Sequence, residues 1–371
     1  MELRRLTYGS GASFETLWDE FVLGHPDATV GHLRATFALA EVQGALNSSI
    51  LMIDEKDKVR AALPLFVVRS STLRLVPVRT VTSGPEFPAH PLFDSSLSAK
   101  HRAEALSLLL AAVAEVASAH RADITAISYA PVIGGQVGLM KYHYLPLRSY
   151  GFEDANLVGF LLDLSLGVDE LEKRLSPTCR NKIRRAKREG CVVRPIRDSS
   201  EWLQCRDLAL QTLGGGADSV SAHQSIWNDF VLPGLARTYA VVSPGSEVPS
   251  MVVVTVGWNG CWYYWKSFSD RSARVPGSGN LALWEAIVDS KSRGATFFEL
   301  GSMEFGDPKQ KAISDFKESF GGTPTYFLRG VRERRPIRHA AVQLLSALWH
   351  ASRRSRRDTP GKSGSPPRED A

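Results

Sequence analysis

The stretch Lys266–Gly301 reads KSFSDRSARVPGSGNLALWEAIVDSKSRGATFFELG. A strand ends at its start, and the loop Arg274-Val-Pro-Gly277-Ser-Gly279 follows. A helix is expected over 280–293, because apolar residues recur there at helical spacing. These residues are Leu281, Trp284, Ile287 and Val288. A further strand, 296–300, completes a strand–loop–helix–strand unit, which indicates a protein that mixes helices with sheets.

Working outward from this unit, the same order of elements occurs twice: helix pair, antiparallel hairpin, loop, helix, strand. In the first half we expect helices at 13–23, 32–44 and 100–119, strands at 49–54, 58–68 and 124–129, and a Pro/Gly loop over 77–98. In the second half we expect helices at 168–189, 199–213 and 222–235, and strands at 191–195, 238–243, 249–257 and 261–268. The repeat predicts two α+β domains of one kind, 1–150 and 151–330. Each is a mixed, mostly antiparallel sheet flanked by helices.

The composition narrows the class of protein. The chain has 371 residues, 43% of them hydrophobic and 23% charged, which is typical of a soluble globular protein. It contains no apolar run long enough for a transmembrane helix and no signal-peptide core at its start. The four cysteines form no CxxC pair and the histidines no HxxxH pair, so we expect free thiols, no metal site and a cytoplasmic location.

The positive charge is concentrated near the C-terminus. The formal net charge is +6, but residues 329–357 contribute +8, and residues 1–328 sum to −1. The near-neutral body argues against a broad nucleic-acid surface. Residues 331–352 predict a cationic amphipathic helix, which either lies on an anionic membrane through 331–357 or docks on the core. The polar segment 353–371 is expected to be disordered.

The glycine-rich loop is a candidate phosphate site. Glycines before a helix allow backbone N–H groups to converge on an anion, and the helix dipole favours negative charge there. An arginine would add a charge-assisted contact. The residues concerned are Arg274, Gly277, Ser278, Gly279 and Asn280. The alternative is a turn that joins a strand to a helix; the loop is not a Walker A motif, because no GKS or GKT follows the glycines.

Three motifs carry a resemblance to a known family. The pattern Arg274-x-x-Gly277-x-Gly279 resembles the acyl-CoA pyrophosphate loop of the GNAT acyltransferases. The segment Glu299-Leu300-Gly301, followed by FKESFGG at 316–322, is similar to the Fem family of peptidoglycan aminoacyltransferases. The segment LDLS at 162–165, leading to LSPTCRNKIRRA at 175–186, resembles the entry to the second domain of that family. The resemblance covers about residues 10–330.

The resemblance implies two tandem GNAT-like domains that transfer an acyl or aminoacyl group to an amine. The donor would be acyl-CoA or aminoacyl-tRNA, with no permanently bound cofactor. The acceptor would be a cell-wall or polysaccharide precursor, as a small molecule or lipid-linked. The matching position makes Lys317 a candidate for binding phosphate or stabilising the intermediate; otherwise it is an exposed helix lysine. Glu299 is a candidate general base, or else a polar residue at a sheet edge. Tyr264 is a candidate proton donor, or else it packs in the core.

The basic segment 180–188 has three interpretations: a solvated face, a dock for substrate phosphates, or a tRNA contact. Its candidate substrate-binding residues are Arg180, Lys182, Arg184 and Arg185. Some Fem enzymes carry a long helical arm in the second domain, and 199–235 shows no charged heptad segment. That departure puts aminoacyl-tRNA in doubt and leaves an acyl-CoA donor more open.

Other functions stay open on the sequence alone. One is a non-catalytic scaffold associated with a membrane or RNA, and another is an N-acyltransferase of a soluble small molecule. The first domain has no counterpart of the Arg-x-x-Gly-x-Gly loop. We therefore expect a single donor site in the second domain, with the first domain shaping the acceptor cleft. A cytoplasmic enzyme, peripheral at the inner face of the membrane, would suit a lipid-linked acceptor.

Overall fold

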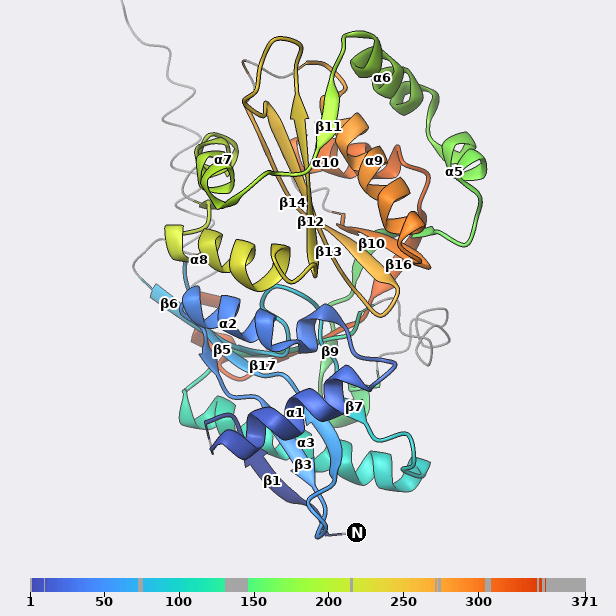
Figure 1. Ribbon diagram of the computed structural model, residues 1–371. Coiled ribbons are helices and arrows are strands. Elements are labelled where there is room, and N and C mark those ends of the chain that lie inside the picture. Colours follow the sequence, from blue (N-terminus) through green and yellow to red (C-terminus); the bar gives the residue numbers. More distant parts are fainter. Residues whose placement is uncertain are drawn as a thin grey trace, which may run out of the picture.

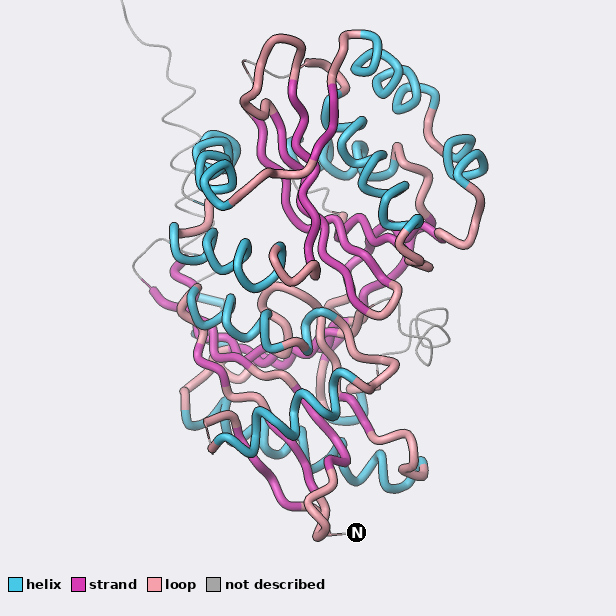
Figure 2. Tube along the Cα trace, in the orientation of Figure 1, coloured by secondary structure: helices cyan, strands magenta, loops and turns pink. Residues whose placement is uncertain are grey.

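The computed structural model describes residues 2–9, 11–72, 76–130, 146–213, 216–270, 272, 275–303, 308–338, 340–341 and 344. It has two lobes, with the N-terminal half of the chain in the lower lobe and the C-terminal half in the upper lobe (Figure 1). Both lobes combine β-sheet with helices packed against it (Figure 2).

The first half contains the following described elements: β1 (Arg4–Thr7), α1 (Ala12–Leu23), α2 (Arg34–Val42), β2 (Leu46–Asn47), β3 (Ile50–Ile53), β4 (Val59–Leu63), β5 (Phe66–Thr72), β6 (Val76–Thr82), β7 (Leu92–Phe93), α3 (Ala99–Ala119), β8 (Ile124–Ser128) and β9 (Glu153–Asp154). They form two sheets, ordered β1-β3-β4-β7 and β2-β5-β6-β8-β17-β9. The strand β17 comes from the end of the chain.

The expected strand 58–68 is wrong in one respect, because it is two strands in two sheets. Pro64 lies between β4 and β5, and proline has no backbone N–H to donate to a sheet. The chain therefore leaves the first sheet at Leu63 and enters the second at Phe66. The expected loop 77–98 is also partly wrong, since β6 occupies residues 76–82.

The second half contains the following described elements: β10 (Leu157–Asp163), α5 (Val168–Arg174), α6 (Pro177–Arg188), β11 (Val192–Arg194), α7 (Ser199–Leu213), α8 (Val220–Ser225), η5 (Ile226–Val231), β12 (Ala236–Val242), β13 (Met251–Trp258), β14 (Cys261–Ser269), α9 (Ser278–Ser292), β15 (Phe297–Ser302), α10 (Pro308–Glu318), β16 (Thr323–Phe327) and β17 (Arg329–Glu333). One seven-stranded sheet runs β11-β12-β13-β14-β15-β10-β16.

The expected helix 168–189 is broken into α5 and α6. The Ser176 hydroxyl accepts a hydrogen bond from the Cys179 N–H at 3.1 Å, and Pro177 occupies the first turn. A serine cap followed by proline starts a new helix, because proline is tolerated only where no intrahelical N–H is needed. The turn lets α6 lie along α9 on the upper lobe (Figure 1).

One strand in the larger sheet of the first half comes from the end of the chain. β17 follows the second half in sequence but pairs between β8 and β9 of the first. β10, which opens the second half, pairs between β15 and β16 of its own half. The six-stranded sheet therefore includes residues from both sides of the second domain, and β17 ties the halves together by backbone hydrogen bonds.

A single hydrophobic cluster also spans the two halves. Trp18 and Phe37 of the first half belong to the same buried cluster as Trp202 and Phe230 of the second. A second cluster lies on the other side of the seven-stranded sheet, under α6 and α9, and contains Ile183, Leu281 and Phe298. The seven-stranded sheet is therefore covered on both faces: one face packs toward the first half, and the other packs against α6 and α9.

The C-terminal helix begins later than expected. Residues 331–333 belong to β17, and helix is described at 336–338, 340–341 and 344. Ile337 is 88% exposed and Leu344 is 62% exposed. The rest of the expected helix, and the segment 353–371 expected to be disordered, lie outside the described residues. Among the helices that the structure describes, none has the length and apolar character to span a membrane.

Candidate functional site

The site begins where two parallel strands stop pairing. β14 and β15 pair at three positions, from Cys261–Phe297 to Tyr263–Glu299. Beyond that point β14 continues beside β13 to Ser269, and β15 continues beside β10 to Ser302. The two strands therefore take different partners as they run on. A parallel pair that ends in this way leaves the side chains at its last position beside unpaired backbone.

A bulge in β14 accompanies the change. Val254 of β13 faces Lys266, and the next residue, Thr255, faces Tyr264, so Trp265 is an extra residue. A bulge of this kind bends a strand and redirects its side chains. Tyr263 and Phe268, which regular alternation would place on opposite faces, consequently both pack on the side that faces the first half.

Glu299 lies at the last paired position and is almost fully buried, with 4% of its surface exposed. Its Oε1 atom accepts a hydrogen bond from the Gly301 N–H at 2.6 Å. Burial raises the pKa of the Glu299 carboxyl to about 7, although this hydrogen bond and the charge of Lys317 oppose the rise. A carboxyl with a pKa near neutrality can accept and release a proton at physiological pH.

Lys317 reaches the same place from α10. Its Nζ donates a hydrogen bond to the Ser302 carbonyl oxygen at 2.8 Å. Gly301 has a φ of +81°, and a Cβ atom added there would lie 3.0 Å from the Lys317 Nζ. Glycine thus gives both the left-handed backbone and the space for the ammonium. The structure brings Glu299 and Lys317 together around Gly301, although 18 positions separate them in the sequence.

Tyr264 lies on the other side of the sheet from Glu299. It packs with the cluster under α6 and α9, whereas the Glu299 carboxyl interacts with Cys261 and Tyr263 of the opposite cluster. The Tyr264 hydroxyl donates to the Ser267 hydroxyl at 2.7 Å, and burial raises its pKa. The structure therefore does not place Tyr264 with the other two candidate catalytic residues.

The glycine-rich loop packs tightly against α6. Gly277 has a φ of +92°, and a Cβ atom there would lie 2.2 Å from the Lys182 carbonyl oxygen. Ser278 is fully buried, and a Cβ atom on Gly279 would lie 3.0 Å from the Met251 Cε. The Asn280 amide donates to the Cys179 sulfur at 3.3 Å. Arg274 lies outside the described residues.

A cavity of about 570 Å³ opens beside the start of α9. Asn280 and Lys182 line it together with residues of α6 and one face of α10, among them Phe316 and Ser319. The Lys182 side chain is exposed at this cavity. The cavity has the size of a ligand site, and its charged lining residues are Lys182, Asp315 and Glu318. Asp315 pairs with Lys311 at 2.7 Å, and Lys182 together with the start of α9 offers the positive side of the cavity to an anionic group.

Arg180 and Arg185 of α6 have structural partners, and Arg184 lies at another cavity. The Arg180 guanidinium donates to the carbonyl oxygens of Glu172, Lys173 and Leu175, so it caps the end of α5. Arg185 forms an ion pair with Glu189 at 2.6 Å. Arg184 lines a separate cavity of about 500 Å³ with Asp169 and Glu172. Of the four candidates, the structure places Lys182 at the cavity beside α9.

A polar cluster at the junction of the two halves was missed from the sequence. The Lys266 ammonium lies 3.2 Å from a Glu86 oxygen and 3.1 Å from an Asp218 oxygen. The Trp265 indole N–H donates to Glu86 at 2.5 Å. Glu86 comes from the Pro/Gly loop of the first half, and nothing in its local sequence indicates that it docks on β14.

No protein-family model matches the chain, and no curated protein matches its sequence; its fold, however, is similar to that of several solved structures. FemX is 15% identical with a TM-score of 0.65, and the match covers 93% of this chain and 100% of FemX. A tandem GNAT protein from the clavulanic acid pathway is 13% identical with a TM-score of 0.53, covering 90% and 98% of the two chains.

The chain has a tandem GNAT fold of the Fem type. The C-terminal domain of a putative lysylphosphatidylglycerol synthetase from Agrobacterium fabrum shares it, with 14% identity, a TM-score of 0.54, and coverage of 91% of this chain and 96% of that domain. The expected fold class, two tandem GNAT-like domains with mixed, mostly antiparallel sheets, is confirmed. At these identities the likeness concerns the fold, and function has to be argued from the site.

Proposed function

We propose that the protein is an acyltransferase that moves an acyl or aminoacyl group to an amine. The observation that carries the proposal is the pair Glu299 and Lys317 at the point where β14 and β15 stop pairing. A buried carboxyl with a pKa of about 7 suits a general base, and an ammonium beside it suits a developing oxyanion. The shared fold with FemX and a tandem GNAT protein supports this class of reaction.

Glu299 and Lys317 have different roles in the proposed reaction. The amine of the acceptor attacks the carbonyl carbon of the donor, and the Glu299 carboxylate takes the proton that the nitrogen loses. Charge then develops on the carbonyl oxygen, where the Lys317 ammonium stabilises it. Collapse of the intermediate breaks the bond to the leaving group, a thiol for acyl-CoA or a ribose hydroxyl for aminoacyl-tRNA. Glu299 returns its proton to that leaving group.

For the donor we propose acyl-CoA, with aminoacyl-tRNA as the alternative. Lys182 and the start of α9 border a common cavity, which suits a pyrophosphate. Arg274, in the preceding loop, is proposed as a second phosphate contact. For the acceptor we propose an amine on a cell-wall or polysaccharide precursor, in line with the Fem-type fold. A soluble small-molecule acceptor is the alternative, supported by the neighbour from clavulanic acid biosynthesis.

Thiol release from acetyl-CoA, measured with a panel of amino sugars and muramyl peptides, tests the reaction. We expect Lys317→Met to lower kcat by about 100-fold or more, because an oxyanion donor contributes that much. Lys311→Met is the matched control, since Lys311 lies on the same helix and pairs with Asp315 at the surface. Equal turnover in the two variants, or no transfer to any amine from acetyl-CoA or charged tRNA, would remove the support for the proposal.

Calorimetric titration with acetyl-CoA tests the donor site separately. We expect Lys182→Met and Arg274→Ala each to weaken binding about tenfold, which is about 1.4 kcal/mol. Arg185→Met serves as the control, because Arg185 is paired with Glu189 on the same helix. Binding of charged tRNA in place of acetyl-CoA would identify the alternative donor.

We also propose a peripheral contact between the C-terminal segment and an anionic membrane. Ile337 and Leu344 are exposed on the helix that follows β17, and arginines flank them in the sequence. Co-sedimentation with vesicles of anionic lipid tests this contact. The double variant Ile337→Asp, Leu344→Asp is expected to bind much less than the native chain. Equal sedimentation of the two proteins would exclude the contact.

A further inference from the structure

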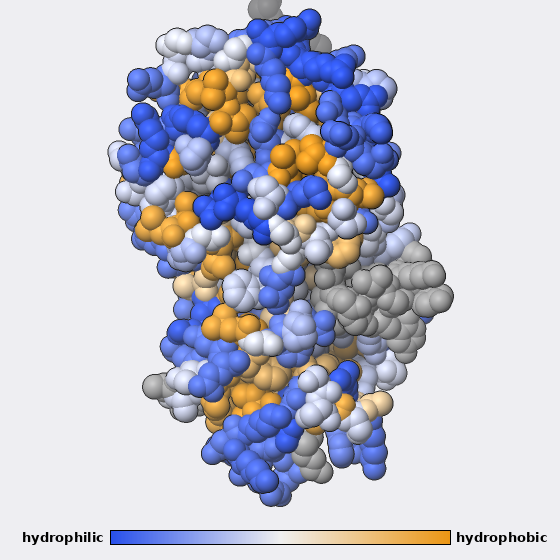
Figure 3. All heavy atoms as spheres, turned by 45° about the vertical axis from the view of Figure 1, so that its right-hand side comes forward, coloured by the Kyte–Doolittle hydropathy of each residue, from blue (hydrophilic) through white to orange (hydrophobic). Residues whose placement is uncertain are grey.

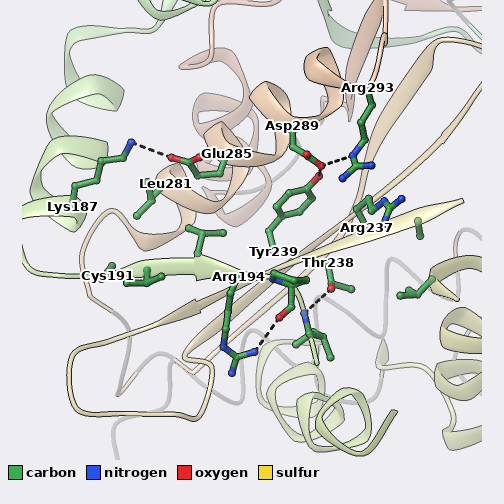
Figure 4. Close-up of a pocket in the computed structure, with 16 residues that line it drawn as sticks. Lys187, Cys191, Arg194, Arg237, Thr238, Tyr239, Leu281, Glu285, Asp289 and Arg293 are labelled. Carbon is green, nitrogen blue, oxygen red and sulfur yellow. Dashed lines mark hydrogen bonds and ion pairs between the residues drawn. The ribbon is translucent and has the colours of Figure 1, made fainter. Parts of the chain in front are cut away.

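A second cavity lies at the β11 edge of the seven-stranded sheet. Its volume is about 760 Å³, and its lining residues are all different from those of the cavity beside the start of α9. One wall is a single face of α9, formed by residues spaced four apart: Leu281, Glu285, Asp289 and Arg293. Edge strand β11 and strand β12 form the other wall, and Lys187 lies at one end (Figure 4). We call this the β11–α9 cavity.

Part of the β11–α9 cavity is apolar. Val192, Val193, Ile196 and Leu281 line it, and Val192 is 58% exposed on the edge strand. The upper lobe, viewed toward the side that carries α5, α6 and α9, shows apolar patches set among charged surface (Figure 3). A cavity of this size that combines an apolar part with charged groups at fixed positions suits an amphipathic small molecule.

The acids of the cavity already have partners. Glu285 pairs with Lys187 at 3.0 Å. Asp289 accepts a hydrogen bond from the Tyr239 hydroxyl at 2.8 Å and pairs with Arg293 at 2.9 Å. Figure 4 shows the Tyr239 ring pointing from β12 toward this carboxylate. Each acid therefore neutralises one cation of the lining.

Two further arginines line the cavity, and they differ in their hydrogen-bond partners. Arg194 donates two hydrogen bonds to Glu201, a buried carboxylate outside the lining, at 2.6 and 2.9 Å. Arg237 lies two residues before Tyr239 on β12 and so projects from the same side of the strand. Its Nε atom is buried and has no hydrogen-bond partner among the residues that the structure describes. Its charge helps to lower the pKa of Asp289, but that carboxylate is already paired with Arg293. With Arg194 on Glu201 and Lys187 on Glu285, Arg237 is the cation of the lining that has no carboxylate of its own.

We propose that the β11–α9 cavity binds a small amphipathic carboxylate. The Arg237 guanidinium would hold the carboxylate, whose two oxygens match its fork of N–H donors. Val193 and Leu281, which belong to the same cluster on the α9 side, would contact the apolar body. One excess cation suits a monoanion better than a phosphate with two negative charges. This site is independent of the proposed acyl transfer, because neither Glu299 nor Lys317 belongs to it.

Calorimetric titration with decanoate, kept below its micelle concentration, tests the proposal, with decanol as the neutral comparison. We expect decanoate to bind the native protein and Arg237→Met to weaken it at least tenfold, whereas decanol binds both proteins equally. Lys187→Met is the matched control, because that cation lines the same cavity but is paired with Glu285. It should change decanoate affinity less than twofold.

A second variant covers the case in which Arg237→Met disturbs the fold. Val193 is only partly buried on the edge strand and packs with the cluster on the α9 side, so Val193→Asp places a negative charge on the apolar wall. It is expected to weaken decanoate binding at least tenfold. No decanoate binding to the native protein, or equal affinity in the native protein and both variants, would overturn the proposal.

Discussion

The two halves contain the same parallel strand pair and use it differently. In the first half β6 and β8 pair at three positions, from Thr80–Ile124 to Thr82–Ala126. Ser83 then continues the connection, because its N–H donates to the Ala126 carbonyl oxygen and its hydroxyl accepts from the Ser128 N–H. In the second half the pairing of β14 with β15 ends at Tyr263–Glu299. Hydrogen bonds of Ser83 thus extend the β6–β8 pair, whereas the β14–β15 pair ends at Glu299.

The residue at the third position shows what this difference means. It is Ala126 in the first half, where it is fully buried, and Glu299 in the second. Burying a carboxyl costs free energy that a buried alanine does not. The same fold thus supports a packed junction in one half and a reactive group in the other. The predictions below test whether that contrast has functional meaning.

The largest effect is expected on turnover. Glu299→Gln should lower kcat of acyl transfer by 10²- to 10⁴-fold, because it removes the proposed general base while keeping the shape of the side chain. In the native protein kcat should rise with pH through about 7, where the Glu299 carboxyl loses its proton. Steady-state rates between pH 5 and 9 provide the measurement.

The control is a buried acid of the first half. Asp123 lies just before β8, where it accepts hydrogen bonds from the Arg79 N–H and from Arg338. Burial opposes its ionisation, but these hydrogen bonds hold the pKa of Asp123 below its usual range. Asp123→Asn should therefore lower stability at pH 7 and leave kcat unchanged. A loss of turnover in Asp123→Asn equal to that in Glu299→Gln would contradict the assignment.

The next effect concerns stability and has the opposite sign for the two acids. The folded protein holds a proton on Glu299 between pH 4.5 and about 7, and the unfolded chain releases it. Stability from this group is complete below pH 4.5 and is lost as pH rises through 7. The native protein should lose about 3 kcal/mol relative to Glu299→Gln over this window. Urea unfolding at pH 5 and pH 8 measures it.

For Asp123 the comparison reverses. Its lowered pKa means that its stabilising contribution is present at neutral pH and is lost on acidification. The native protein should therefore exceed Asp123→Asn in free energy of unfolding at pH 7, with the gap narrowing toward pH 3. If Glu299→Gln is no more stable than the native protein at pH 8, the Glu299 carboxyl is not protonated through burial.

Much of this contrast follows from the sequence, and part of it does not. Periodicity located β14, β15 and α9, and the motifs around Glu299 and Lys317 pointed to one site before their proximity was known. The placement of β17 in a sheet of the first half left no local signal, because it depends on pairing between distant segments. The bulge at Trp265 and the docking of Glu86 are likewise set by packing across the junction.

Two other differences between the expected and the observed elements are marked by local sequence features, although the apolar periodicity favoured continuous elements. Pro64 interrupts an otherwise continuous apolar run, and a proline inside such a run argues against one strand. Ser176-Pro177 has the form of a helix start, which marks the break between α5 and α6. The side chain of Tyr264 could not be placed relative to Glu299, because their relation depends on how two strands align in the sheet.

The loops before α3 and α9 also differ between the halves. The N-cap residue of α3 is Ser98, whose hydroxyl accepts a hydrogen bond from the His101 N–H, whereas the N-cap residue of α9 is Gly277. Gly277→Ala would bring a Cβ atom to 2.2 Å from the Lys182 carbonyl oxygen, with strained φ in addition. We expect a loss of about 2 to 3 kcal/mol in urea unfolding and weaker acetyl-CoA binding.

Gly294, just beyond the other end of α9, is the matched control. It has a φ of +83°, but a Cβ atom there would have nothing within 4 Å. Gly294→Ala should therefore cost only the backbone strain, about 1 kcal/mol, and leave acetyl-CoA affinity unchanged. Equal losses for the two variants would show that the contact between the loop and α6 contributes nothing.

The smallest expected effect lies at the junction itself. Glu86→Gln keeps an oxygen that can accept the Trp265 indole N–H and removes the charge that faces Lys266. Lys266 retains Asp218 at 3.1 Å, and the three charged side chains are less than one-fifth exposed. We therefore expect a loss of about 1 kcal/mol in free energy of unfolding, more than a surface pair but less than an unpaired buried charge.

Asp57→Asn provides the reference, because Asp57 pairs with Arg4 while 70% of its side chain is exposed. That change should cost less than about 0.5 kcal/mol. If Glu86→Gln costs no more, the loop of the first half adds nothing to the attachment of β14. A larger loss that also raises KM for the amine, with KM for the donor constant, would show that the first half positions the acceptor beside Glu299. The first half would then contribute directly to the reaction at the site of the second half.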